Sequence, residues 1–360
     1  MRWLLYAAVL AIAIALPLVL PDYTQQFSAL WVLIVLALTW DMQGGQMGYN
    51  SLGNIFFFGL GMYVSAIVQI GMFHDMAAYT FAGGTQQFAI TDSQYFTGLA
   101  IGPIVAGLVS AVVAVPLGWL LFGLRGPYFA IGTLGVAVAA GEMFATWMYV
   151  GGGQGIPMPR FPGDPDTAKL AFYVMFFATG VACFATCAWL YSTRFGLALN
   201  AIRDDEQKAE GMGLPTLRIK QLNWAIAAFF IGVVGALYGN NVGFIEPRNV
   251  AFQTIFLGIY MIVAVLLGGK GTLWGPVIGA VVFHTFKEVT WTLLLGWQYV
   301  ALGALIVVVV VYFQEGILGW LARQRPEWFG RRIEAKTIAA DHGSGHGAEP
   351  EKDPAQGAPA

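Results

Sequence analysis

Charge is scarce in this sequence, and the scarcity excludes most soluble proteins. Only 11% of the 360 residues are Asp, Glu, Lys or Arg, whereas 58% are hydrophobic. Soluble domains carry about 25% charged residues, so a soluble multi-domain enzyme is excluded. The net charge of −2 provides no basic field that would attract DNA or RNA. We therefore expect no nucleic-acid partner.

Cysteine and histidine are also rare. The two cysteines, Cys183 and Cys187, lie four positions apart in an apolar run, which can form neither a disulfide framework nor a four-ligand metal site. Of the four histidines, two lie near the C-terminus and the others, His74 and His284, are far apart. P-loop, H-E-x-x-H and G-x-S-x-G motifs are missing, so the sequence indicates no ATPase site, no catalysis and no cofactor.

Long apolar runs are abundant instead. A helix needs about 20 mostly apolar residues, rising about 1.5 Å each, to cross a hydrocarbon core of about 30 Å. Such runs cover residues 3–20, 27–41, 51–73, 97–123, 127–149, 170–191, 222–243, 254–269, 273–292 and 298–313. None alternates like a barrel strand. The sequence predicts an all-α fold, a polytopic transmembrane bundle of about eight to ten spans.

The distribution of Lys and Arg predicts the orientation. With ten spans, one face of the membrane carries only Arg160, Lys169, Arg248 and Lys287, and the other face carries the remaining basic residues. Basic loops stay in the cytoplasm, so both termini are predicted to be cytoplasmic. The first run could instead be a cleaved signal peptide, but no small-x-small site directly follows it, and we expect a span.

Two domains are expected. Residues 1–320 form the membrane domain, and residues 321–360 form a cytosolic tail. The tail ends in Gly, Ala, Pro, His and charged residues without an apolar period, so it is predicted to be disordered.

Glycine clusters predict breaks in the helices. Residues 43–54 and 268–276 are candidates for broken or re-entrant backbone, which is tolerated only inside protein or beside a watery cavity. Gly275 and Gly279 have the G-x-x-x-G spacing of closely packed helices.

One carboxylate lies well inside a predicted span. Glu142 could face a polar path through the membrane or reach the outer interface. A proton-coupled carrier would need more such residues than the sequence offers.

The segment 194–220 is charged, lies between two long apolar runs and is predicted to be helical. Asp204 can cap a short helix, with Gln207 in the capping-box position. Gly213 is suited to a left-handed stop, and Pro215 prevents continuation. From these residues alone, the helix could be a coupling element or a solvated connector on lipid headgroups.

Residues 201–206 (AIRDDE) and 209–213 (AEGMG) resemble the cytoplasmic coupling loop of ABC importer permeases, specifically the branched-chain amino acid permease family. Four further motifs, in the same order, are similar to that family: GYNSLGN at 48–54 continuing to Phe57, Gly61 and Tyr63; RGPYFA at 125–130 with Thr133 and Leu134; GGQGI at 152–156; and LGGKGT at 267–272 continuing to Gly275, Pro276, Gly279 and Ala280. Val150, Asn54 and Trp224 depart from the family pattern and leave the substrate open.

The resemblance implies a permease subunit in the bacterial inner membrane. Its partners would be a second homologous permease subunit, two cytosolic ATP-binding subunits and a periplasmic substrate-binding protein. The implied substrate is a branched-chain amino acid, although related permeases carry urea, amides or aromatic acids. The alternative is a stand-alone urea or amide facilitator or a secondary transporter, which would leave the charged helix without a role.

The resemblance also implies candidate sites. The charged candidates for the ATPase contact are Arg203, Asp204, Asp205, Glu206 and Glu210, with Gly213 shaping the turn. The contact could instead depend on apolar residues seated in a groove of the partner, namely Leu199, Ile202 and Met212. The candidates for the translocation path are Asn50, Ser51, Tyr128, Thr133 and Glu142.

Overall fold

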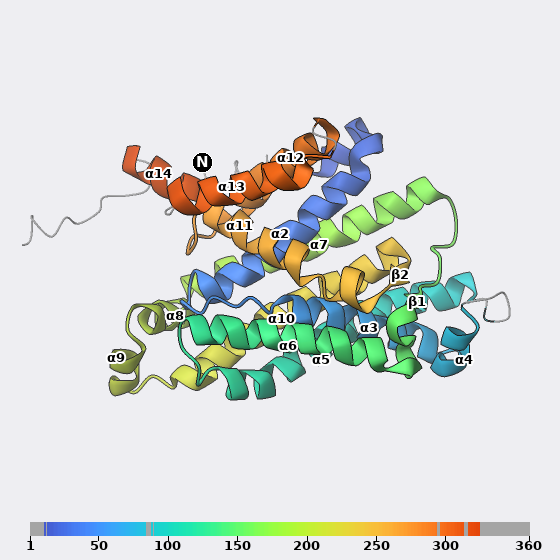
Figure 1. The fold of residues 1–360 in the computed structure, drawn as a ribbon, viewed down its shortest axis with the longest axis horizontal. Coiled ribbons are helices and arrows are strands. Elements are labelled where there is room, and N and C mark those ends of the chain that lie inside the picture. The colour runs from blue at the N-terminus through green and yellow to red at the C-terminus, as the bar shows by residue number, and fades with distance from the viewer. Residues whose placement is uncertain are drawn as a thin grey trace, which may run out of the picture. The chain divides into compact units, whose positions relative to one another are not determined.

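Helices provide nearly all the regular structure of this computed structural model, which describes residue 11 and residues 13–83, 88, 90–293, 296–312 and 316–324 (Figure 1). The α-helices are α2 (Thr24–Gly44), α3 (Ile55–Gly71), α4 (Met76–Phe81), α5 (Asp92–Leu121), α6 (Pro127–Thr146), α7 (Pro165–Ser192), α8 (Arg194–Asp204), α9 (Glu206–Gly211), α10 (Thr216–Val242), α11 (Ile259–Gly268), α12 (Gly275–Leu293), α13 (Gln298–Tyr312) and α14 (Gly316–Gln324). Between them lie the short helical turns η1 (Pro21–Tyr23), η3 (Met148–Val150), η4 (Gly152–Gln154), η5 (Pro247–Ala251) and η6 (Thr254–Gly258), and one antiparallel pair, β1 (Ile156–Pro157) with β2 (Phe244–Ile245). The all-α prediction is confirmed.

Within the part of the chain that the structure describes, five helices are long and apolar enough to cross a membrane, and they cover Pro21–Gly44, Asp92–Leu121, Pro127–Thr146, Pro165–Ser192 and Thr216–Val242. The predicted span at 254–269 differs most from its prediction. It divides into the π-helical turn η6 and α11, and the ten residues of α11 rise only about 15 Å. The predicted span at 3–20 lies largely outside the described residues.

The chain divides into two units, Met1–Leu318 and Gly319–Ala360. The first contains all the described helices up to α13, and α14 runs from the first unit into the second. Most of the predicted tail, from residue 325 onward, lies outside the described residues.

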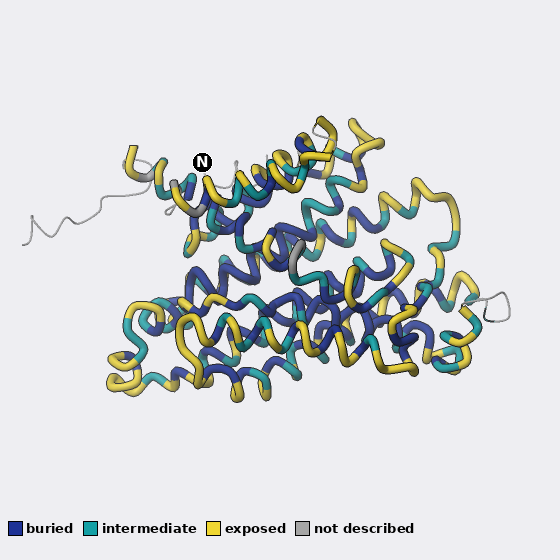
Figure 2. The backbone as a smooth tube through the Cα atoms, in the orientation of Figure 1, coloured by how far each residue is buried: buried dark blue, intermediate teal, exposed yellow. Residues whose placement is uncertain are grey.

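The core of the first unit forms around α10, which packs against α5, α3, α2 and α7. Small residues allow the backbones to approach. A Cβ added to Gly61 of α3 would lie 2.2 Å from the carbonyl oxygen of Gly232 in α10, and one added to Gly232 would lie 2.3 Å from Ser110 Oγ in α5. Close backbone packing holds helices together where lipid removes the hydrophobic drive. Buried residues of α3, α5 and α10 lie where these helices cross (Figure 2).

The two predicted helix breaks occur and lie against each other. The helix α2 ends at Gly44 and α11 ends at Gly268, with irregular backbone after each. Asp41 Oδ1 accepts a hydrogen bond of 2.7 Å from the backbone N–H of Gly271. A Cβ on Gly45 would lie 2.4 Å from that same nitrogen. Glycine is therefore needed where the two breaks meet.

The G-x-x-x-G pair acts as predicted. A Cβ on Gly279 would lie 1.8 Å from the carbonyl oxygen of Ala264 in α11, and one on Gly275 would lie 2.0 Å from that of Gly269. These contacts bring the start of α12 against the end of α11.

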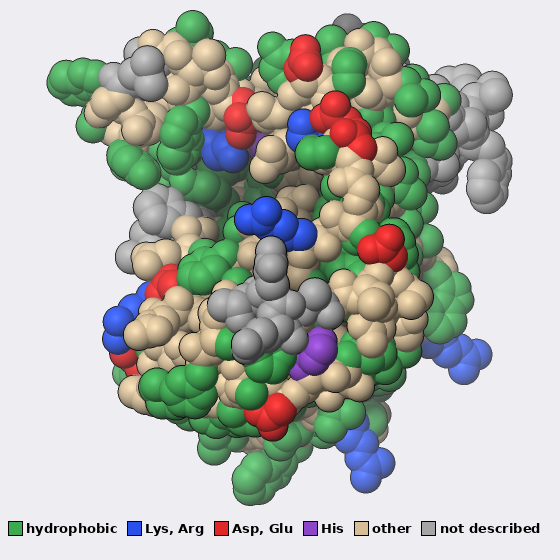
Figure 3. All heavy atoms as spheres, turned by 90° about the vertical axis from the view of Figure 1, so that its right-hand side faces the viewer, with side chains coloured by type: hydrophobic (Ala, Val, Ile, Leu, Met, Phe, Trp, Pro, Cys, Tyr) green, Lys and Arg blue, Asp and Glu red, His purple; other side chains and the backbone are tan. Residues whose placement is uncertain are grey.

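The glycine loop at 151–155 lies at the opposite end from α8 and α9 (Figure 1). Gly151 and Gly155 both have positive φ, and the loop leads into β1, which pairs with β2. Viewed from this end, the surface is hollowed, and both basic (Lys, Arg) and acidic (Asp, Glu) side chains lie around the hollow (Figure 3).

Candidate functional site

The segment 194–220 forms two helices, α8 and α9, before α10 begins. Thr193 Oγ1 accepts from the N–H of Phe195 at the start of α8, and Asp205 Oδ1 accepts from the N–H of Lys208 at the start of α9. The prediction that Asp204 is the cap was therefore wrong by one residue. The helix started by Thr193 continues through Asp204, and Asp205 is the residue with extended backbone.

The predicted stop is confirmed. Gly213 has a φ of +86° and donates to the carbonyl oxygen of Glu210, while the N–H of Leu214 returns to that of Ala209. These bonds satisfy carbonyl groups that the end of a helix leaves free. A new helix, α10, then starts directly after Pro215.

Glu206 lies at the centre of a polar cluster that joins α9 to the rest of the chain. Its Oε2 accepts a hydrogen bond of 2.5 Å from Tyr49 Oη, and its Oε1 accepts one of 2.5 Å from Lys220 Nζ of α10. Lys220 Nζ also donates to Tyr49 Oη at 3.1 Å, and Arg125 Nε lies 3.9 Å from Glu206 Oε2. We call Tyr49, Arg125, Glu206 and Lys220 the Glu206 cluster.

Aromatic rings shield the Lys220 side of the cluster. Lys220 Nζ lies 4.8 Å from the ring centroid of Tyr49 and 5.4 Å from that of Phe122, within the range of cation–π attraction. Tyr49 also meets Phe122 and Phe129 edge to face. The Lys220 side chain is 3% exposed and that of Glu206 12%. Because both charges are shielded, their interaction is stronger than at an open surface.

The protonation states fit this arrangement. Burial alone would raise the pKa of Glu206, but the hydrogen bonds from Lys220 and Tyr49, together with the positive charges of Lys220 and Arg125, lower it below its usual value. Burial, and then the hydrogen bond to the Glu206 carboxylate, raise the pKa of Tyr49, so its hydroxyl stays protonated. At neutral pH, Glu206 is therefore an anion that accepts from two donors.

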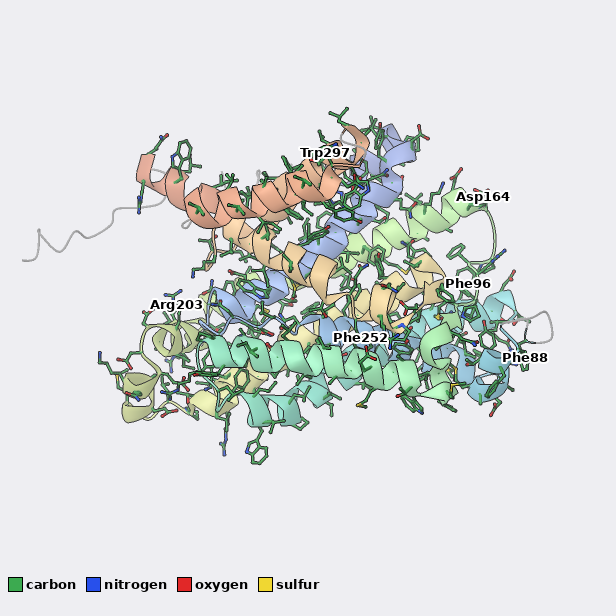
Figure 4. All side chains as sticks on the ribbon, in the orientation of Figure 1. Phe88, Phe96, Asp164, Arg203, Phe252 and Trp297 are labelled. Carbon is green, nitrogen blue, oxygen red and sulfur yellow. The ribbon has the colours of Figure 1, made fainter. Side chains whose placement is uncertain are left out.

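The other predicted coupling residues fall into two groups. Leu199 and Ile202 are buried within this chain, whereas the exposed group consists of Arg203, Asp204, Glu210, Met212 and Gly213; Asp205 is half-buried. Arg203 lies at the α8 end of the unit in Figure 4, and its Nη1 donates to the carbonyl oxygen of Gly45 at 3.3 Å. The exposed group is available to a partner, and the buried group holds α8 in place.

Sequence reasoning missed three members of the Glu206 cluster and one exposed apolar side chain. Tyr49 and Arg125 lie inside motifs that resemble the family, so the sequence indicated that these two segments matter. It did not indicate that either side chain contacts Glu206. Lys220 lies where an apolar run begins, and its sequence position does not identify its partner. Leu197 is 70% exposed on α8, and its apolar sequence neighbours gave no signal of that exposure.

Two of the residues predicted to line the translocation path, Thr133 and Ser51, lie where the motif at 48–54 meets α6. Thr133 Oγ1 accepts from the N–H of Leu52 at 3.1 Å, and a Cβ on Gly53 would lie 1.9 Å from the carbonyl oxygen of Thr133. Ser51 is buried beside them, whereas Asn50 is exposed. The motif at 48–54 therefore packs against α6 near its start.

The remaining path candidates lie on the surface of α6. Tyr128 is exposed, and Glu142 forms a two-bond ion pair with Arg248 of η5, with N–O distances of 3.0 and 2.7 Å. Both charged side chains of this pair are exposed. Glu142 thus joins α6 to η5.

Comparisons with known proteins agree with this architecture. Residues 23–310 match the family described as branched-chain amino acid transport system / permease component. The high-affinity branched-chain amino acid transport system permease protein LivM of Salmonella typhimurium is 25% identical over 339 residues, covering 84% of this chain and 77% of the relative. The corresponding LivH protein of Escherichia coli strain K12 is 30% identical over 156 residues, covering 43% and 47%.

A probable LivM protein of Methanocaldococcus jannaschii is 25% identical over 275 residues, covering 70% of this chain and 76% of the relative. No solved structure matches. The family match spans the helices from η1 to α13, including both glycine breaks and the coupling segment. This chain, a multi-pass membrane protein, belongs to the branched-chain amino acid transport permease family.

Proposed function

We propose that this chain is a permease subunit of an ATP-driven importer of branched-chain amino acids, and that separate ATP-binding subunits dock on α8 and α9. One observation carries the proposal. The turn after α9 presents Met212, 74% exposed, beside exposed Glu210, while Glu206 anchors the same helix to the interior. Because α9 is exposed on one side and anchored to the interior on the other, a movement of the docked ATP-binding subunits can be transmitted through it.

The contacts of Glu206 determine which segments a movement of α9 would displace. Glu206 contacts Lys220, in the first turns of α10, and Tyr49, in the segment that joins α2 to α3. The helix α10 packs against α5, α3, α2 and α7. A displacement of α9 would therefore tilt a packed group of helices as a body, which is how alternating access is produced.

The charges support a cytoplasmic position for this end. Arg125, Arg194, Arg203, Lys208, Arg218, Lys220 and Lys270 all lie in or beside the segments around α8 and α9. We propose that this end faces the cytoplasm and both termini do as well. A periplasmic binding protein would then deliver solute at the other end, in a bacterial inner membrane, to a pair formed with a second homologous permease.

The test is whether the exposed turn holds the ATP-binding subunits. Met212→Asp places a charge in the proposed interface. We expect the affinity for the ATP-binding subunits to fall about tenfold or more, which is about 1.4 kcal/mol of binding, with loss of the co-purifying subunits and a fall in uptake. Met148→Asp is the matched control, since Met148 is an exposed methionine at the opposite end.

Equal co-purification in both variants would contradict the docking surface. Purification of the unaltered chain without any ATP-binding subunit, in several mild detergents, would contradict the importer itself and favour the stand-alone facilitator.

A further inference from the structure

A cavity of about 280 Å³ lies beside Tyr238, near the C-terminal end of α10, whereas the Glu206 cluster contacts the start of α10 through Lys220. Its lining comes from α2, α10, α11, α12, α13, η6 and the residue before η6: Ala29, Val32, Leu33, Tyr238, Gln253, Leu257, Tyr260, Phe283, His284, Lys287, Trp291 and Tyr299. Liquid water occupies about 30 Å³ per molecule, so the space exceeds a single trapped water. It is close to the lower end, about 300 Å³, of the range for small-molecule sites.

The packing of α11 against α12 explains why the space exists. At one end, Gly275 and Gly279 bring the two backbones into contact. Toward the other end, the rings of Tyr260 and Phe283 separate the helices, with centroids 5.2 Å apart. Both rings also line the cavity.

One side of the cavity carries polar groups. Lys287 Nζ lies 2.8 Å from Glu288 Oε1, and the Lys287 side chain is 21% exposed. His284 is more than nine-tenths buried; its Nε2 lies 3.9 Å from Glu288 Oε1 and has no hydrogen-bond partner within the described residues. A buried polar atom without a partner is costly, so a ligand or water oxygen near it would be stabilised.

The rest of the lining is largely apolar. Val32 and Leu33 of α2 are buried and, with Leu257, provide the aliphatic contacts. Aromatic rings provide the others: Tyr238, Tyr260, Phe283, Trp291 and Tyr299. This lining suits a small molecule with a carboxylate at one end and a hydrocarbon group at the other, because the carboxylate can accept a hydrogen bond from the Lys287 ammonium and the hydrocarbon group can contact the apolar side chains.

We propose that this cavity binds the transported solute, an α-amino acid with an aliphatic side chain, with its carboxylate toward Lys287 and His284 and its side chain against Val32, Leu33 and Leu257. The proposal rests on the transport function above and names its solute site. The five path candidates chosen from the sequence do not line this cavity. Because Tyr238 and Lys220 both belong to α10, one helix would connect the solute site with the Glu206 cluster.

The chain is well suited to cysteine labelling, because its own Cys183 and Cys187 are fully buried. We would introduce Gln253→Cys, and independently Leu257→Cys, in the assembled complex and measure labelling by an anionic, membrane-impermeant methanethiosulfonate. L-leucine should slow labelling at both positions. Ser93→Cys, exposed in the first turn of α5, should label at a rate that leucine does not change.

A charge test identifies the carboxylate end. Lys287→Met should slow labelling of the introduced cysteine by the anionic reagent about tenfold, the lower end of the effect of charged clefts on rates, and should not slow a cationic reagent. Lys169→Met removes a charge from α7, which contributes no lining residue, and should change neither rate.

Absence of labelling at both introduced cysteines would show a cavity filled by lipid and would overturn the proposal, as would labelling that leucine leaves unchanged. These outcomes are separate from a failure of the importer proposal, which is judged from the ATP-binding subunits that co-purify.

Discussion

At the scale of single residues, the buried pair of Glu206 and Lys220 is the contact whose loss should matter most. Glu206→Met leaves Lys220 as a buried cation without its carboxylate, and Lys220→Met leaves Glu206 without its cation; removing one partner costs about 3–5 kcal/mol in comparable pairs. Replacing both, in Glu206→Met with Lys220→Met, should restore much of that stability because no unpaired charge is left. Thermal unfolding of the detergent-purified complex measures each variant.

The decisive quantity is the interaction free energy between Glu206 and Lys220, obtained from the stabilities of the single and double variants. If the double variant were destabilised by the sum of the single variants, the pair would not interact, and the geometry of the Glu206 cluster would be contradicted.

The contact between Glu206 and Lys220 should weaken in acid. Since the pKa of Glu206 is lowered in the folded protein, its stabilisation is complete above the usual Glu pKa and is lost as the pH falls through the lowered value.

Only part of this cluster was predictable. The charged character of Glu206 and its place in a coupling segment follow from the sequence, but Tyr49 is 157 residues away from it. Charge and periodicity describe which side chains are polar and which face of a helix they share. They do not specify which distant loop closes over that face, because that depends on how the helices pack.

At the scale of elements, the start of α9 offers a paired test. Asp205→Ala removes the side chain that caps the helix, which should cost about 0.5–2 kcal/mol. Asp204→Ala removes the same chemical group one position earlier, where it forms only an exposed pair with Arg203, and should cost less than about 1 kcal/mol. Amide hydrogen exchange over residues 206–211 reports both.

Faster exchange in Asp205→Ala alone is the expected result. The opposite ranking would return the cap to Asp204, as the sequence first suggested.

Helix positions were predictable where the apolar run was long. The run at 127–149 became α6, and its start is explained by Gly126, with a φ of +54°, and Pro127 at the first helical position. The run at 254–269 was less predictable, because apolar composition cannot distinguish one helix from a π-helical turn followed by the short α11. The cap error has a similar origin, since Asp204 and Asp205 are equivalent by type and differ only in backbone conformation.

At the scale of the whole molecule, assembly of the membrane core depends on helix crossings rather than on hydrophobicity. Apolar side chains are as well solvated by lipid as by one another, so the fit between backbones has to select the native arrangement. The crossing of α3, α5 and α10 at Gly61, Gly232 and Ser110 is the central example. The exposed apolar side chains on α5, such as Leu108 and Val112, are then free to face lipid or the second permease.

Gly61→Ala tests this crossing directly, and Gly71→Ala in the same helix is its control. A Cβ at position 61 would lie 2.2 Å from a backbone oxygen of α10, which cannot rotate away, whereas a Cβ at position 71 would meet nothing within 4 Å. Overpacking of this kind costs about 1–3 kcal/mol, and the alanine at position 71 should be neutral or slightly stabilising because alanine favours the helix. The thermal midpoint of the detergent-purified protein should therefore fall for Gly61→Ala only. Equal midpoints would mean that α3 and α10 are farther apart than the structure places them, and the path from the Glu206 cluster through α10 to the cavity would lose its rigid support.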